Sequence, residues 1–131
     1  MQITKQADYA LRAMRYLATL EPGKRAATSF IAKEEHIPPS FLAKIVSQLS
    51  IAGLITTSRG ARGGVSLAHA PDEISLLEVV EAIDGPIMLN ECVLHPEVCE
   101  FGENCPIRPI WQESQSELVN RLKNTNFKQL A

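Results

Sequence analysis

The three cysteines of this chain lie in one short segment, Cys92 to Cys105, which reads CVLHPEVCEFGENC. Pro96 and Gly102 interrupt helical structure and no alternating apolar pattern favours a strand, so the segment is predicted to form neither a good helix nor a strand. A loop this long and this poor in apolar side chains needs something other than a hydrophobic core to order it. Thiolates of Cys92, Cys99 and Cys105 converging on a metal would supply that order.

Two other chemistries can use the same cysteines. Together with His95 they make a tetrahedral zinc site, although the segment has no CxxC pair, which zinc knuckles usually contain. Alternatively the cysteines are bare redox thiols whose oxidation acts as a switch. The acidic residues in the segment oppose this second chemistry, because nearby negative charge raises the cost of ionising a thiol.

The overall composition is that of a globular protein. The chain has 131 residues, 45% of them hydrophobic, which suits one domain or one small domain with an extension. It has no apolar run of membrane-spanning length and no signal-peptide core, and its cysteine number is odd, so a cytoplasmic protein is expected. Because the three histidines are scattered and no Ser/His/Asp set is present, an enzyme is not expected.

The charge is divided unevenly along the chain. Residues 1–70 carry nine Lys/Arg against four Asp/Glu, a net charge of +5, while residues 71–131 carry four against eleven, a net charge of −7. A basic half can bind a polyanion while an acidic half stays clear of it. This asymmetry favours nucleic acid as a partner.

The basic half is predicted to contain a helix-turn-helix. Apolar residues at helical spacing predict a helix over 3–20, a short helix starts near residue 28, and Pro38-Pro39 opens a third helix that ends at Gly53. The third helix is predicted to bury Phe41 together with its other apolar residues, and to present Ser40, Lys44 and Gln48 on the opposite face. Such a polar, basic face is typical of a recognition helix in the major groove of DNA.

A hairpin is predicted directly after the third helix. Residues 54–57 and 65–67 read as short strands, and the glycine-rich turn between them displays Arg59 and Arg62. A hairpin at this place makes a wing, whose arginines can reach phosphates or the minor groove.

Two further helices are predicted in the acidic half. Ser75 and Glu78 form a capping box at the start of one that ends at Gly85-Pro86. The other runs over 106–123, with Ile107, Trp111, Leu118 and Leu122 on a near-heptad seam. That seam suits pairing with a second copy of the chain, and packing on its own domain is the alternative.

Five segments in this order resemble the Rrf-two family of winged-helix iron–sulfur transcription regulators (IscR/NsrR-like). They are ITKQADYALRAMRYLA, PPSFLAKIVSQLSIAGLI, SRGARGGVSLA, SLLEVVEAIDGP and the three cysteines before a terminal helix. The resemblance covers nearly the whole length. It implies a homodimer that binds a pseudo-palindromic operator on double-stranded DNA and carries an iron–sulfur cluster on each subunit.

The resemblance also implies roles for particular residues. Cys92, Cys99 and Cys105 match the cluster thiolates; Ser40, Lys44 and Gln48 match the DNA-reading face; and Ser58, Arg59 and Arg62 match the wing. IscR-like members have a histidine ligand where this chain has Arg108, whereas NsrR-like members use an acidic residue of the first helix of the partner subunit, and Asp8 stands there. The alternative for Asp8 is a surface ion pair with Arg12, one helical turn away.

The expected architecture is mainly helical with a small β-hairpin wing: a winged helix-turn-helix over 1–85, a cysteine segment over 86–106, and a dimerisation helix and tail over 107–131. The expected function is that of a DNA-binding regulator, a repressor, controlled by an iron–sulfur cluster (4Fe–4S favoured over 2Fe–2S) that senses nitric oxide, redox state or cluster supply. The alternatives are regulation through zinc or bare thiols and, more distantly, a thiol or metal-trafficking protein that does not bind DNA.

Overall fold

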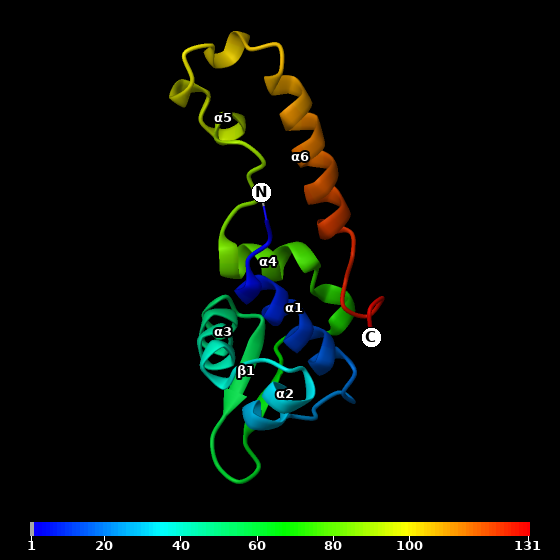
Figure 1. Cartoon of the computed structure of the whole chain (residues 1–131). Helices are drawn as coiled ribbons and strands as arrows, with labels where there is room; N and C mark the ends of the chain where they lie inside the picture. Colours follow the sequence, from blue (N-terminus) through cyan, green and yellow to red (C-terminus); the bar gives the residue numbers. More distant parts are fainter. Residues whose placement is uncertain (1) are drawn as a thin grey trace.

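The computed structural model describes residues 2–131 and is elongated, with a winged helix at one end and a helical extension at the other (Figure 1). The helices are α1 (Lys5–Ala18), α2 (Thr28–Glu34), α3 (Pro39–Ile51), α4 (Leu76–Asp84), α5 (Glu91–Leu94) and α6 (Arg108–Lys123), the strands are β1 (Ile55–Ser58) and β2 (Gly64–Leu67), and short 3₁₀ turns occupy Pro71–Glu73, Pro96–Val98 and Gly102–Asn104. Among these residues no helix is both long and apolar enough to cross a membrane. The predicted helices and the hairpin are confirmed.

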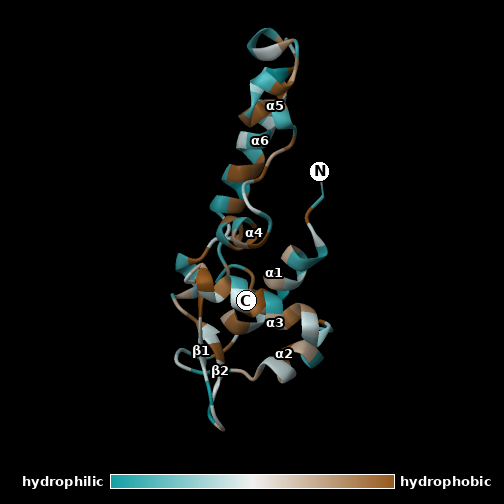
Figure 2. Cartoon of the chain, turned by 90° about the vertical axis from the view of Figure 1, so that its left-hand side faces the viewer, coloured by the Kyte–Doolittle hydropathy of each residue, from teal (hydrophilic) through white to brown (hydrophobic). Residues whose placement is uncertain are grey.

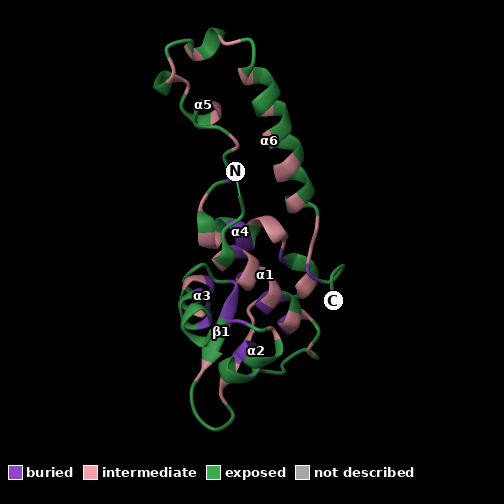
Figure 3. Cartoon of the chain, in the orientation of Figure 1, coloured by how far each residue is buried: buried purple, intermediate pink, exposed green. Residues whose placement is uncertain are grey.

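The core lies between α1, α3, α4 and the hairpin, where the buried residues gather (Figure 3). On α1 the predicted apolar stripe holds at Ala7, Ala10, Met14 and Leu17, because these positions recur every three or four residues and so share one face. Ile3 is exposed, since the helix begins two residues after it.

The turn between α2 and α3 is short, and one of its residues adopts the left-handed backbone conformation. His36 takes a φ of 53°, which ends α2, and Ile37 then enters the core before Pro39 opens α3. Helix α3 buries Leu42, Ile45 and Leu49. The predicted burial of Phe41 is wrong: this side chain is 43% exposed and packs edge-on against Tyr9 of α1, because the buried stripe of α3 begins one residue later.

The wing is an antiparallel pair in which Ile55 lies opposite Leu67 and Ser58 opposite Gly64. Ala26, before α2, bridges to Val65 through two backbone hydrogen bonds of 3.0 and 2.8 Å and ties the wing to the helix-turn-helix. Gly64 is required at this junction, because a Cβ there would lie 2.6 Å from the Ala26 carbonyl oxygen.

Helix α4 packs against α1 and connects the winged helix to the extension. The Ser75 hydroxyl accepts a hydrogen bond of 3.2 Å from the Glu78 N–H, so the serine half of the predicted capping box is formed. The carboxylate half is not formed within residues 2–131: no hydrogen bond joins the Glu78 carboxylate to the Ser75 N–H, and β-bridge pairing instead brings Ser75 beside Asn126 of the tail.

The extension consists of α5, two 3₁₀ turns and α6, and none of residues 88–126 is buried. Brown, hydrophobic stretches are interspersed with teal ones along α6 and the segment beside it (Figure 2). The prediction that the cysteine segment forms no helix is wrong in part, since α5 makes one α-helical turn around Cys92 before Pro96 ends it.

The chain returns to the winged helix after α6. Phe127 is fully buried, and its N–H donates to the carbonyls of Pro71 and Ile74, each at 3.2 Å. The Arg15 side chain donates to the Leu130 carbonyl at 2.9 Å. The tail thus anchors the C-terminal end of α6 to the core.

Candidate nucleic-acid interface and cysteine segment

The predicted DNA-reading residues of α3 differ in their accessibility. Ser40 and Lys44 are exposed on the face opposite the buried stripe. Gln48, one turn further on, is half-buried, and its Oε1 atom is shielded from solvent with no hydrogen-bond partner within residues 2–131. An unpaired buried acceptor costs about 1–3 kcal/mol, so the Gln48 amide gains energy if it swings outward to a donor.

The wing places its cations at the end of the molecule farthest from α5 (Figure 1). Arg59 and Arg62 are exposed in the turn, and Ser58 is half-buried at the end of β1. Neither arginine forms an ion pair or a side-chain hydrogen bond with any part of the described chain. Both guanidinium groups are therefore available to phosphates.

The cysteine segment is tied to α6 by polar contacts. The Arg108 guanidinium donates to the carbonyls of Cys92 and Val93 at 2.8 and 3.3 Å, and Gln115 accepts from the Leu89 N–H at 3.0 Å. These bonds close α5 against the start and middle of α6. Arg108 therefore acts here as a brace for the turn that carries the first cysteine.

The three cysteines are free thiols of intermediate exposure: Cys92 lies on α5, and Cys99 and Cys105 directly follow the 3₁₀ turns Pro96–Val98 and Gly102–Asn104. In the part of the chain that the structure describes, no three His, Cys, Asp or Glu side chains are gathered closely enough to hold a metal ion. His95 lies 3.4 Å from the Glu97 carboxylate, and more than half of its side chain is exposed. The donor types suit a soft metal, but their arrangement in one chain does not form a finished site.

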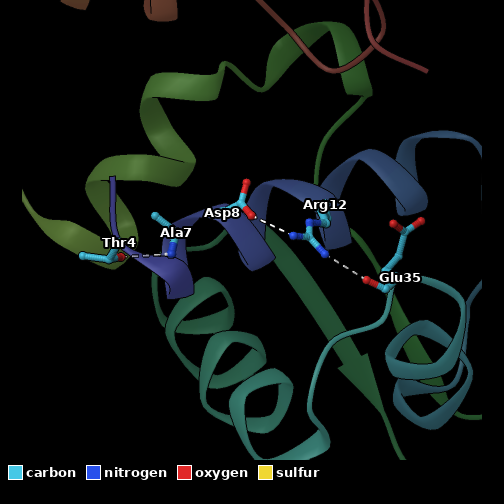
Figure 4. Close-up of polar contacts among 5 residues, drawn as sticks. All are labelled: Thr4, Ala7, Asp8, Arg12 and Glu35. Carbon is cyan, nitrogen blue, oxygen red and sulfur yellow. Dashed lines mark hydrogen bonds and ion pairs between the residues drawn. The ribbon is translucent and has the colours of Figure 1, made fainter. Parts of the chain in front are cut away.

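Asp8 lies on α1, within the winged helix. Its carboxylate pairs with Arg12 at 2.9 Å, and Arg12 also donates to the Glu35 carbonyl at 3.2 Å (Figure 4). The Arg12 guanidinium lies 5.1 Å from the centre of the Tyr9 ring. In one chain Asp8 belongs to this surface cluster, so a role toward the cysteines requires a second subunit and stays a prediction.

The first turn of α1 is fastened to the end of α4. The Thr4 hydroxyl accepts from the Ala7 N–H at 3.1 Å and donates to the Asp84 carboxylate at 2.5 Å, while the Thr4 N–H donates to the same carboxylate at 3.3 Å. A carboxylate at a helix N-terminus also interacts favourably with the helix dipole. This contact joins the end of α4, from which the cysteine segment begins, to the helix that carries Asp8.

Tyr16 lies further along α1, where its ring packs on Phe30 of α2 with centroids 6.0 Å apart. Burial raises the pKa of the Tyr16 phenol above its usual value, and the carboxylates of Glu34 and Glu35 raise it further. The phenol is therefore neutral at physiological pH and adds no charge to the contact between α1 and α2.

The predicted dimerisation seam of α6 is divided between two environments. Ile107 and Trp111 are 57% and 39% exposed, and Ile110 beside them is as exposed as Ile107. Leu118 and Leu122 are half-buried, in the half of α6 that approaches α4. Both halves of the seam remain predicted dimer contacts. In the single chain, the half around Ile107 and Trp111 is exposed to solvent.

Sequence reasoning did not find three contacts: the Arg108 brace, the pairing of Thr4 with Asp84, and the Phe127 anchor. Each joins segments far apart along the chain, and periodicity carries no such information. A phenylalanine in a short tail with few other apolar residues was the one available signal, and it pointed to Phe127.

Helix-turn-helix, wing and unpaired cations on one exposed end define a winged-helix DNA-binding protein. The chain belongs to the Rrf2 (Rrf-two) family: the family model, described as an iron-dependent transcriptional regulator, matches residues 3–131. The resemblance and the fold class predicted from sequence are thereby confirmed. The protein is a transcription regulator, and its relatives are regulators rather than enzymes.

Curated relatives and solved structures agree with this assignment. A protein of Aquifex aeolicus described as an HTH-type transcriptional regulator is 37% identical over 124 residues, covering 93% of this chain and 85% of its own length. The regulator NsrR of Halalkalibacterium halodurans is 31% identical, covering 99% of this chain and 90% of its own.

Two solved structures of the regulator CymR are also similar. CymR of B. subtilis, the global cysteine regulator, superposes with a TM-score of 0.86 at 28% identity over 100% of this chain and 96% of its own. An oxidised form of Staphylococcus aureus CymR has a TM-score of 0.79 at 28% identity over the same shares of the two chains.

Proposed function

We propose that this protein is a homodimeric repressor that binds a pseudo-palindromic operator through α3 and the wing. The observation that carries the proposal is the free, exposed state of Lys44, Arg59 and Arg62 at one end of the winged helix. Helix α3 enters the major groove, and the wing contacts phosphates or the minor groove. A dimer seated on promoter DNA represses by excluding the transcription machinery.

We propose that each of three segments has its own role. Residues 1–85 bind DNA, residues 86–106 sense the signal, and residues 107–131 hold the dimer together. The tail after α6 also joins the dimerisation segment to the DNA-binding segment, because Phe127 is buried in the core of the winged helix. The exposed apolar residues at the start of α6 support the dimer, since a single chain leaves them in water.

The cysteine segment is the proposed sensor, and its proposed ligand is an iron–sulfur cluster, 4Fe–4S in preference to 2Fe–2S. Support comes from three partly exposed thiols within residues 88–106, none of which is buried, and from the description of the family as iron-dependent. A bound cluster supplies redox and nitric oxide chemistry. Since one chain does not gather three ligands, binding requires the turns around Cys92, Cys99 and Cys105 to close up, with Asp8 of the partner as the proposed fourth ligand.

The chain's own contacts offer a route from the cysteines to DNA. Arg108 and Gln115 hold the segment on α6, while its root at the end of α4 is bonded to Thr4 of α1 through Asp84. A change in the segment therefore reaches α1 and the tail, which both pack against the core that positions α3.

A metal-free thiol switch is the second candidate. One observation favours it: the likeness to CymR, one of whose structures is an oxidised form. In this case oxidation of Cys92, Cys99 or Cys105 changes the segment directly.

The sensing proposal is tested by purifying the full chain without oxygen and measuring absorption, iron, acid-labile sulfide and zinc. A cluster gives a brown protein with a broad band near ~400 nm and about four irons and four sulfides per chain, which substitution of the cysteines by serine abolishes. A colourless protein with about one zinc per chain replaces the sensor by a structural site. A colourless protein without metal whose DNA affinity changes on mild oxidation establishes the thiol switch.

The DNA-binding proposal is tested separately, by electrophoretic mobility of random-sequence duplex DNA at low salt, followed by selection of preferred sites from genomic fragments. Retardation that weakens steeply with salt, and selected sites with two half-sites about one helical turn apart, are expected. A protein that leaves duplex DNA unretarded in every cysteine state contradicts the proposal.

A further inference from the structure

A cavity of about 620 Å³ lies beside the wing, away from both α3 and the cysteine segment. It is formed where the end of α1 and the following turn meet β2, the 3₁₀ turn at Pro71–Glu73 and the C-terminal tail. Its volume falls within the range of about 300–1,000 Å³ typical of small-molecule sites. No contact described above for DNA, metal or dimerisation uses it.

The apolar part of the cavity comes from aliphatic side chains. Leu17 is buried, and Leu20 and Leu67 are half-buried beside it, with Pro71 at the edge. These side chains face an opening that nothing in residues 2–131 fills. They offer a binding surface to a small apolar group.

The rim of the same cavity carries unpaired charges of both signs. Lys24 and Lys128 provide two cations, and Glu21 and Asp72 provide two carboxylates. Within the described chain, none of these four side chains, nor that of His69 beside them, forms an ion pair or a hydrogen bond. The two cations and the two carboxylates balance, so a polyanion gains nothing here, whereas a molecule with both charges can pair at both ends.

We propose that this cavity binds a free α-amino acid with an apolar side chain. Its carboxylate pairs with Lys24 or Lys128, its ammonium group pairs with Glu21 or Asp72, and its side chain covers the leucines. The site also has a route to DNA binding, because Leu67 belongs to the wing strand and the Pro71 carbonyl accepts from the Phe127 N–H of the tail. Occupancy therefore ties wing and tail together.

The first test is an NMR titration of the full-length, ¹⁵N-labelled protein with each common L-amino acid at up to about 10 mM, tenfold above a Kd of about 1 mM. At least one apolar amino acid is expected to give saturable shifts at residues 17–24 and 66–72. Acetate and methylammonium, which each carry half of the charge pair, are expected to give none. The proposal is overturned if no amino acid gives saturable shifts, or if the shifts map elsewhere.

Paired charge reversals make the test specific. The double variant Lys24→Glu/Lys128→Glu should bind the amino acid at least about tenfold more weakly, because a charge-assisted contact becomes a repulsion. The matched control Lys33→Glu/Lys123→Glu changes the net charge equally at exposed positions outside the cavity and should bind like the parent. Equal weakening in both variants, or in neither, also overturns the proposal.

A DNA titration with and without the amino acid then measures how far amino-acid binding changes the affinity for DNA. This experiment alone rests on the proposed function. If amino-acid binding is found and duplex DNA is not bound at all, the ligand site stands and the operator-binding proposal fails.

Discussion

At the residue scale, the arginines fall into two groups with different tasks. Arg12, Arg15 and Arg108 each donate to a backbone carbonyl of a distant segment and so hold the fold together. Arg59 and Arg62 make no such contact with the described residues. A cation without an internal partner can be removed at little cost in stability, which makes these two suitable probes of a ligand.

Arg59→Ala and Arg62→Ala are expected to weaken binding to specific and random duplexes alike. Each lost phosphate contact should lower the slope of log K against log salt by about 0.9. Fluorescence anisotropy over a range of salt concentrations measures this slope.

Lys123→Ala is the control for the wing, since this lysine lies at the C-terminal end of α6, outside α3 and the wing. It should leave the slope unchanged. Slopes of the two wing variants equal to that of the parent would exclude the wing from the interface.

Arg108→Ala is expected to loosen the first cysteine turn. Loss of two charge-assisted hydrogen bonds to α5 should speed amide exchange around Cys92 and Val93 on the order of tenfold. Hydrogen exchange measured by mass spectrometry, together with the rate of thiol alkylation, detects the change. Arg121→Ala, on the exposed side of the same helix, should leave both rates as they are; if the two variants behave alike, the brace has no effect.

At the element scale, α6 is held at both ends but covered along little of its length. Polar bonds join its first half to the cysteine segment, and the tail anchors its far end through Phe127. The helix itself has no buried residue in the single chain. Its position therefore depends on these two attachments and on whatever covers its exposed face.

Phe127→Ala is expected to lower the free energy of unfolding by about 3–5 kcal/mol, because it leaves a cavity in the core. Urea unfolding followed by circular dichroism measures the loss. Ile51→Ala truncates a side chain that is 86% exposed at the end of α3, outside the proposed dimer contact, and should change the value by less than about 0.5 kcal/mol. Equal losses would mean that the tail is not anchored in solution.

At the scale of the whole molecule, the elongated chain has its hydrophobic core at one end and a group of exposed apolar residues at the other. Leu94, Val98 and Phe101 of the cysteine segment are exposed, as are Ile107 and Trp111 of α6. A second copy would cover this surface and bring the partner's α1 near the cysteines. The sensor and the dimer interface would then be one structure.

Ile107→Glu is expected to dissociate the proposed dimer, because the substitution places a charge in a contact from which water is excluded. Sedimentation velocity measures the mass, and the operator affinity should fall with it. Asn120→Glu, on the side of α6 away from Ile107 and Trp111, should leave the dimer intact. A wild-type chain that sediments as a monomer at micromolar concentration would contradict the dimer itself.

How much the sequence could predict is seen most clearly in local patterns. The spacing of Ala7, Ala10, Met14 and Leu17 specified α1 and its buried face, and the glycine-rich stretch after residue 58 specified the wing turn. Helical period, strand alternation and turn chemistry act over a few residues, so they can be read directly from the order of amino acids. The fold class and the exposed state of Lys44, Arg59 and Arg62 follow from them, whereas the family was indicated by the resemblance of five segments in order.

Tertiary structure alone decided the contacts between distant segments. Nothing near Arg108 or Asp84 in the sequence indicates that one braces Cys92 and the other receives Thr4, and the exposed position of Phe41 depends on the rotation of α3 against α1. The same holds for the three cysteines: their types are in the sequence, but whether they meet depends on how the segment folds against α6 and against a second chain. The distances between side chains of different elements arise from the packing of those elements, which residue spacing along one chain does not encode.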